Sequence, residues 1–326
     1  MSDISLRYAA GQIVGQRNRQ EDEYGVLALS ADDPDAILVT VSDGMGGYAG
    51  GAEAAHAAVR GFMDVFESNA GKTADRLTHA ITGANAAVRA LKHEKPVLDS
   101  AGCTLVAALI ENATVSWISV GDSSLFRLRD GTLERLNADH SMRPVLEEMV
   151  AVGRMTAEDV DANPNRNALR SAITGEDIEL VDLCSDVALE PGDQLLLASD
   201  GLNVLSSARV AHLLEEMRDC PLQDTVTALL AAVEAQGAPR QDNTTAILYR
   251  MTAAHHAPKT SHSQRLHTNA ATARSRLVLA SGALLFIGIA TWWLLAAGPG
   301  RVFAQSHGWH WFSNVSASAR PASGRK

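Results

Sequence analysis

Short apolar runs alternate with longer amphipathic stretches along the first 250 residues. The apolar runs are rich in Val, Ile and Leu and are bounded by Gly, Asp and Ser, a pattern typical of buried strands. They lie at residues 36–41, 104–110, 114–120, 193–199 and 244–250. Ala, Leu and Val recur at helical spacing in four other stretches, residues 51–67, 74–92, 209–217 and 222–235. The predicted helices come in pairs and the strands in adjacent runs, which favours α+β layers over a doubly wound parallel sheet.

A different pattern begins after residue 252. Residues 253–276 are small and polar, and we interpret them as a linker. Residues 277–297 are uncharged and nearly all apolar. As a helix they would span about 31 Å, the thickness of a bilayer's hydrocarbon core. We therefore expect a globular domain at residues 1–252, a transmembrane helix at 277–297 and a short tail at 298–326. The alternative, a buried core helix, is disfavoured by the length of the segment and its isolation behind a linker.

Basic residues flank the predicted span unevenly. Arg265, Arg274 and Arg276 precede it, and only Arg301 follows closely. The positive-inside rule then places the N-terminal domain in the cytoplasm and the tail outside.

Charge is also divided along the chain. The net charge is −10 overall, yet residues 253–326 contain eight basic residues and no acidic one. Residues 1–252 therefore carry 20 basic and 38 acidic residues, a net charge of −18. Such a domain repels phosphate backbones, which argues against a nucleic-acid partner. The three cysteines lack the spacing of a zinc site or a disulfide framework.

Four aspartates mark the ends of predicted strands. Asp43, Asp122 and Asp200 each follow an apolar run, and Asp242 precedes the last one. A single Asp-Gly pair is more often a turn, but repetition changes the interpretation. Carboxylates that converge without basic partners repel one another unless a divalent cation binds, and oxygen ligands suit Mg²⁺ or Mn²⁺. Two further acidic residues stand before the run YGVLAL: Glu21 and Asp22.

Seven motifs occur in a fixed order between about residues 5 and 250. They are RNRQED (17–22), VSDGMGG (41–47), GCT (102–104), VGDS (120–123), ADHS (138–141), ASDG (198–201) and QDNT (241–244). Together they resemble the PPM or PP2C-type protein phosphatases in their bacterial form. The segment between the fifth and sixth motifs, from residue 143, resembles that family's mobile flap and the return from it.

The resemblance implies a four-layer αββα sandwich, with two central antiparallel sheets flanked by helices. It also implies two or three Mn²⁺ or Mg²⁺ ions. Asp43, Asp200 and Asp242 would bind the first ion, and Asp43 with the Gly44 carbonyl would bind the second, with Glu21 or Asp22 acting through water. Asp122 with Asp200 would bind a third, weaker ion. Arg17 is expected to bind the phosphate, which suits its planar fork of donors.

The function implied is hydrolysis of phosphoserine and phosphothreonine in proteins by a metal-activated water, with Asp43, Asp200 and Arg17 as catalytic residues. A cognate Ser/Thr kinase and a bacterial inner-membrane location, with the catalytic domain cytoplasmic, complete the expectation. Met45 stands where eukaryotic members have His, so no general acid is assigned. Two alternatives stay open: an inactive phosphatase fold that serves as a binding module, and a hydrolase of small phosphoesters.

Overall fold

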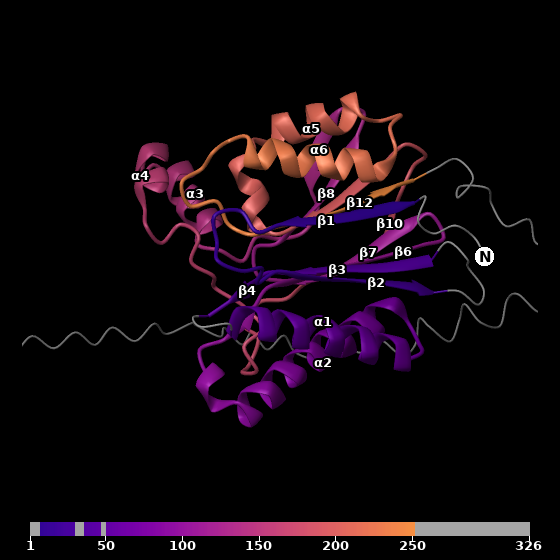
Figure 1. The fold of residues 1–326 in the computed structure, drawn as a ribbon, viewed down its shortest axis with the longest axis vertical. Coiled ribbons are helices and arrows are strands. Elements are labelled where there is room, and N and C mark those ends of the chain that lie inside the picture. The colour runs from indigo at the N-terminus through magenta and orange to yellow at the C-terminus, as the bar shows by residue number, and fades with distance from the viewer. Residues whose placement is uncertain (1–6, 30–35, 47–49, 252–326) are drawn as a thin grey trace, which may run out of the picture. The chain divides into compact units, whose positions relative to one another are not determined.

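Two five-stranded sheets lie face to face between two layers of helices (Figure 1). The structure is a computed structural model and describes residues 7–29, 36–46 and 50–251. All strand pairs among these residues are antiparallel.

The first sheet has the order β1 (Tyr8–Ile13), β12 (Thr244–Arg250), β11 (Gln194–Ala198), β8 (Ser124–Arg129) and β9 (Thr132–Arg135). The second sheet has the order β10 (Asp182–Ala188), β7 (Thr114–Val120), β6 (Leu105–Glu111), β3 (Ala36–Ser42) and β2 (Glu23–Leu29). A separate two-stranded pair is formed by β4 (Gly44–Met45) and β5 (Gly102–Cys103).

Each sheet carries a pair of helices on its outer face (Figure 1). The second sheet is covered by α1 (Gly50–Ser68) and α2 (Thr73–Glu94), and the first by α5 (Ser207–Glu216) and α6 (Leu222–Glu234). Two shorter helices, α3 (Arg143–Ala151) and α4 (Ala157–Ala162), stand apart in the connection between β9 and β10. Single 3₁₀ turns occur at Pro96–Leu98 and Asp200–Val204.

Three apolar clusters hold the four layers together, one at each interface between layers. In β3, Leu38 packs towards α1 and α2, whereas Ile37 and Val39 pack between the sheets. In β11, Leu196 contacts the layer of α5 and α6, and Leu195 contacts the opposite sheet. Both faces of these central strands are buried because side chains alternate along a strand. That is why their sequences are continuous apolar runs.

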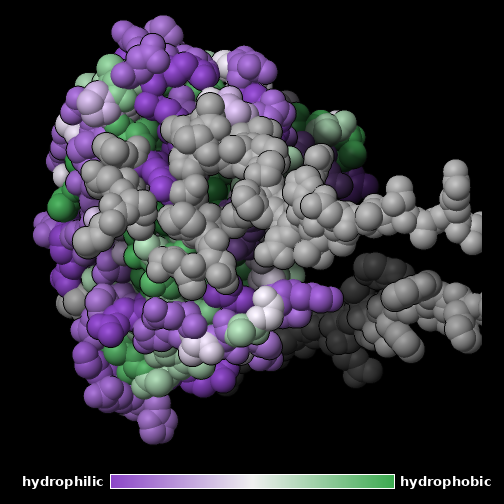
Figure 2. Space-filling view, turned by 90° about the vertical axis from the view of Figure 1, so that its right-hand side faces the viewer, coloured by the Kyte–Doolittle hydropathy of each residue, from purple (hydrophilic) through white to green (hydrophobic). Residues whose placement is uncertain are grey.

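The predicted α+β sandwich is confirmed, and each predicted strand and helix listed above appears within two residues of its predicted bounds. Besides the two-residue strands β4 and β5, four strands were not predicted: β1, β8, β9 and β10. Their apolar residues are interrupted by polar ones, and β10 also contains a register shift. The face in Figure 2 is mostly hydrophilic where described residues are visible, with small hydrophobic areas between.

The predicted membrane segment, 277–297, lies outside the described residues, as do the linker and the tail. Among the helices that the structure describes, none is both long and apolar enough to cross a membrane.

Candidate active site

A pocket of about 940 Å³ opens at the edge where strands of both sheets end. Antiparallel neighbours end and begin at the same edge, so residues that follow β3, β7 and β11 meet residues that precede β2 and β12. The predicted residues that line the pocket are Arg17, Glu21, Asp43, Gly44, Asp122, Asp200 and Asp242. Asp22 is the one predicted site residue that does not line it.

Asp22 instead lies behind the pocket and joins the two sheets. Its Oδ2 accepts hydrogen bonds from Ser199 Oγ and Thr245 Oγ1, both at 2.7 Å, and the residue is only 6% exposed. Its other oxygen, Oδ1, is buried and has no hydrogen-bond partner among the described residues. Burial raises the pKa of Asp22 to about 6; the two hydrogen bonds oppose this rise, and the charges of Asp200 and Asp242 add to it.

Asp43 occupies a tight connection between β3 and β4. Its N–H donates to Thr104 Oγ1 at 3.0 Å, and its carbonyl accepts from the Thr104 N–H at 2.9 Å. A side chain on the next residue, Gly44, would place its Cβ 2.3 Å from the carbonyl oxygens of both Glu21 and Gly51. Only glycine fits there, because two backbone segments approach it directly.

The carboxyl group of Asp43 is held in an electrostatically unfavourable place. Burial is the largest cause that raises its pKa well above the ordinary value, followed by the charges of Asp22, Asp200, Asp122 and Asp242. These carboxylates repel one another, and a divalent cation would offset that repulsion.

The pocket is also lined by Arg17, Asp200 and Asp242. Burial and the neighbouring Asp242 raise the pKa of Asp200, whereas a hydrogen bond with Asp43 and the charge of Arg17 lower it. The Arg17 guanidinium, half exposed, forms an ion pair with the Asp242 carboxylate. Arg17, predicted to bind phosphate, therefore already has a carboxylate partner.

These carboxylates fit hard divalent cations by type, since every donor is oxygen. Within residues 7–29, 36–46 and 50–251, however, no three His, Cys, Asp or Glu side chains are already arranged as a metal site. Asp242, one of the predicted ligands, is paired with Arg17.

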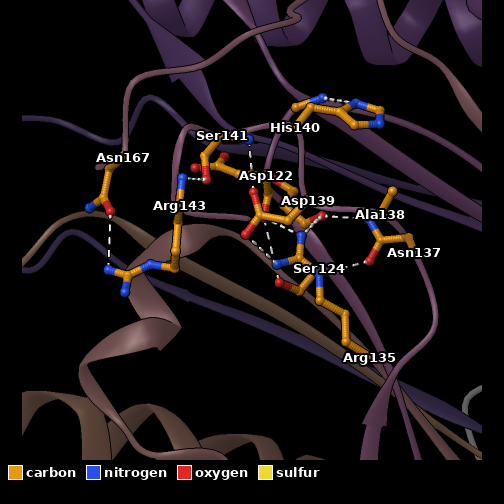
Figure 3. Close-up of polar contacts among 12 residues, drawn as sticks. Asp122, Ser124, Arg135, Asn137, Ala138, Asp139, His140, Ser141, Arg143 and Asn167 are labelled. Atoms are coloured by element: carbon orange, nitrogen blue, oxygen red, sulfur yellow. Dashed lines mark hydrogen bonds and ion pairs between the residues drawn. The ribbon is translucent and has the colours of Figure 1, made fainter. Parts of the chain in front are cut away.

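Asp122 lines the pocket from the turn between β7 and β8. Its pKa is raised to about 7: burial is the largest cause, the charges of Asp200 and Asp139 add to the rise, and Arg135 opposes it. Figure 3 shows Asp122 beside Arg135 and Asp139, which belong to β9 and the loop that follows it.

A further set of residues that line the pocket was not predicted. This set contains Asn167, Arg170, Glu176, Asp177 and Glu179. They lie in the segment that follows α4. Two isolated backbone β-bridges, Ser141 with Leu169 and Cys103 with Ile173, hold this segment at the edge of the sheets. No periodic signal in this polar segment could have placed these residues at the site.

The sequence profile of protein phosphatase 2C matches residues 14–241. The chain belongs to the protein phosphatase 2C family. The serine/threonine phosphatase Stp of Listeria welshimeri is 31% identical over 238 residues, which are 71% of this chain and 90% of that protein. The serine/threonine protein phosphatase PstP of Mycobacterium tuberculosis is 29% identical over 203 residues, 61% of this chain but only 37% of the relative.

Solved structures of the protein phosphatase 2C family agree with the fold. The catalytic domain of PstP, crystallised with two manganese ions, superposes with a TM-score of 0.60 at 26% identity, covering 76% of this chain and 98% of that one. This phosphatase 2C chain thus has the same fold as a protein that was crystallised with manganese. Manganese is also a metal that the oxygen donors of this chain suit.

Proposed function

We propose that this protein hydrolyses phosphoserine and phosphothreonine in other proteins, with two or three Mn²⁺ or Mg²⁺ ions as cofactors. The observation that carries the proposal is the convergence of Asp43, Asp122, Asp200 and Asp242 from four strand ends in one pocket. Membership of the phosphatase 2C family and the names of the relatives support it.

The residues would divide the work as follows. Asp43, Asp200 and Asp242 hold one cation, and Asp43 with the Gly44 carbonyl holds a second. Glu21 or the buried Asp22 acts through water, and Asp122 with Asp200 holds a third ion. When bound, such ions supply Lewis acidity and activate a water for attack on phosphorus.

Arg17 lies at the pocket and is half exposed, so its guanidinium can exchange the Asp242 carboxylate for two phosphate oxygens. It would then offset negative charge that develops on the transferring group. Met45, which also lines the pocket, has no proton to donate, so it does not protonate the leaving group.

The direct test is phosphate release from a phosphothreonine peptide by the full chain in detergent. We expect release with Mn²⁺ or Mg²⁺, none in EDTA, and recovery when Mn²⁺ is returned. A phosphotyrosine peptide and p-nitrophenyl phosphate serve as comparison substrates. Release from the small ester alone would favour a small-phosphoester hydrolase, and no release from any substrate would favour the binding module.

We further propose that residues 277–297 span the bacterial inner membrane, with the phosphatase domain on the cytoplasmic side. The length of the uncharged segment and the three arginines before it support this orientation. Tethering would keep the enzyme near membrane-bound phosphoproteins and the Ser/Thr kinase that it opposes, which raises their effective concentration.

Reporter fusions test this topology. A reporter fused after Lys326 should give an extracytoplasmic signal, because it would follow the span. The matched control ends at residue 276, before the span, and should report from the cytoplasm. A cytoplasmic signal from both fusions would contradict the proposed span.

A further inference from the structure

Arg135, the last residue of β9, places its guanidinium between two loops beside the pocket (Figure 3). Its Nη2 donates to the carbonyl oxygen of Asp122 at 2.9 Å, and its Nη1 donates to Asp139 Oδ2 at 2.9 Å. Its Nε donates to Asn137 Oδ1 at 3.3 Å. One planar side chain therefore joins the turn that carries Asp122 to the loop after β9.

Asn137 strengthens the same connection and is only 4% exposed. Its Nδ2 donates to the Ser123 carbonyl at 2.9 Å and to Ser119 Oγ at 3.1 Å, and its Oδ1 accepts from the Leu125 N–H at 2.8 Å. The turn from β7 to β8 is thus held on both sides of Asp122 by residues of one loop.

The connection continues to both ends of the segment that carries α3 and α4. Asp139 Oδ1 accepts from the Ser141 N–H at 2.8 Å, and Ser141 Oγ accepts from the Arg143 N–H at 3.2 Å. Arg143 Nη2 then donates to Asn167 Oδ1 at 3.4 Å, and Asn167 lines the pocket. Figure 3 shows this row of contacts from Asp122 to Asn167.

The carboxylate of Asp122 depends on this support. Arg135 donates to the backbone carbonyl of Asp122 and not to its carboxylate. Arg135 can therefore influence the carboxylate only through the position of the Asp122 backbone, which lies next to Gly121 with its φ of +99°. The Arg135 bond to the Asp122 carbonyl is the charge-assisted contact that fixes this backbone.

We propose that Arg135 is the positioning residue of Asp122: it clamps the Asp122 turn to Asp139 so that the Asp122 carboxylate is presented to a divalent cation. The inference depends on the proposed function only through the assignment of Asp122 as ligand of the third, weaker ion. Partners of a ligand commonly affect metal affinity by about 10- to 100-fold.

The test is a Mn²⁺ titration of the full chain without substrate. The electron paramagnetic resonance signal of free Mn²⁺ measures how much of the metal is bound. In Arg135→Met the weakest site should lose about 10-fold or more in affinity, while the tighter sites keep theirs. Asp122→Asn should weaken the same site. The double variant should bind no more weakly than Asp122→Asn alone, because both changes act through one carboxylate.

Arg127→Met is the matched control. Arg127 lies in β8, the strand paired with β9, and bonds to Glu134 at 2.7 Å. Among the described residues, its side chain forms no hydrogen bond or ion pair with the Asp122 turn, so this variant should bind Mn²⁺ as wild type does. Circular dichroism checks that each variant is folded.

If Arg135→Met does not fold, Arg135→Lys replaces it. Lysine keeps the charge beside Asp139 but lacks the planar fork that reaches both Asp139 and the Asp122 carbonyl, so a smaller loss at the same site is expected. Wild-type binding by the Arg135 variant, an equal loss at all sites, or no effect of Asp122→Asn would overturn the proposal. Failure of the phosphatase assay with normal Mn²⁺ binding would refute the proposed function alone.

Discussion

Asp43→Asn should lower kcat/KM for a phosphothreonine peptide by about 10³-fold or more, since it removes the charge that both principal cations share. The same variant in EDTA should have a higher thermal midpoint than wild type. The fold raises the pKa of Asp43, so the folded state holds its proton more tightly than the unfolded state does. Above the ordinary pKa, ionisation of Asp43 therefore opposes folding, and the neutral amide removes that opposition.

Asp64→Asn is the control for this prediction. Asp64 is an exposed residue of α1 that does not line the pocket, so its substitution should change neither activity nor the midpoint appreciably. Phosphate release and thermal melting in EDTA measure the two effects. Near wild-type activity in Asp43→Asn would exclude Asp43 as a shared ligand. Lost activity with a lowered midpoint would mean that the substitution damaged the fold instead.

Arg129→Met should destabilise the domain by about 3–5 kcal/mol at pH 7, because it leaves a buried carboxylate without its charged partner. Arg129 ends β8 and bonds to both oxygens of Asp193, at 2.8 and 2.6 Å. The Asp193 side chain is only 2% exposed, and it also accepts from the Glu190 N–H at 2.8 Å. This pair secures the turn between β10 and β11, which links the two sheets.

The pH dependence follows from Asp193. Burial by itself raises its pKa, but the hydrogen bonds from Arg129 and from the Glu190 N–H bring it below the ordinary value. A depressed carboxyl pKa contributes stability above the unfolded value, about 3.9, and that contribution is lost as pH falls through the folded value. Without Arg129, burial dominates and Asp193 can be protonated, so the deficit of the variant should shrink between pH 7 and pH 4.

Urea unfolding followed by circular dichroism in EDTA, at both pH values, measures this deficit. Lys95→Met is the comparison, because Lys95 pairs with Glu53 at 2.7 Å and both side chains are well exposed. Its loss should be much smaller than that of Arg129→Met, because water screens an exposed ion pair. A deficit in Arg129→Met as small as that in Lys95→Met, or one that grows towards pH 4, would contradict the assigned role.

Elements that a local sequence pattern explains were predicted, and elements that depend on distant contacts were not. β3, β7 and β12 were predicted with bounds correct to within one residue, because each is an apolar run that a buried strand explains locally. β8 and β9 were missed, since Arg127 interrupts the apolar residues of β8 and β9 has a single apolar residue, Leu133. The carboxylates at strand ends were predicted, but their partners were not.

By itself, the sequence determined the layers, the family and the set of acidic residues that could hold cations, because strand and helix periods and short motifs are local properties of a chain. The tertiary structure alone decided that Asp22 lies behind the pocket and that Arg17 pairs with Asp242, 225 residues away. It also decided that Arg135 supports Asp122. Such contacts depend on which strand ends meet when two sheets pack, and no period along the chain records that meeting.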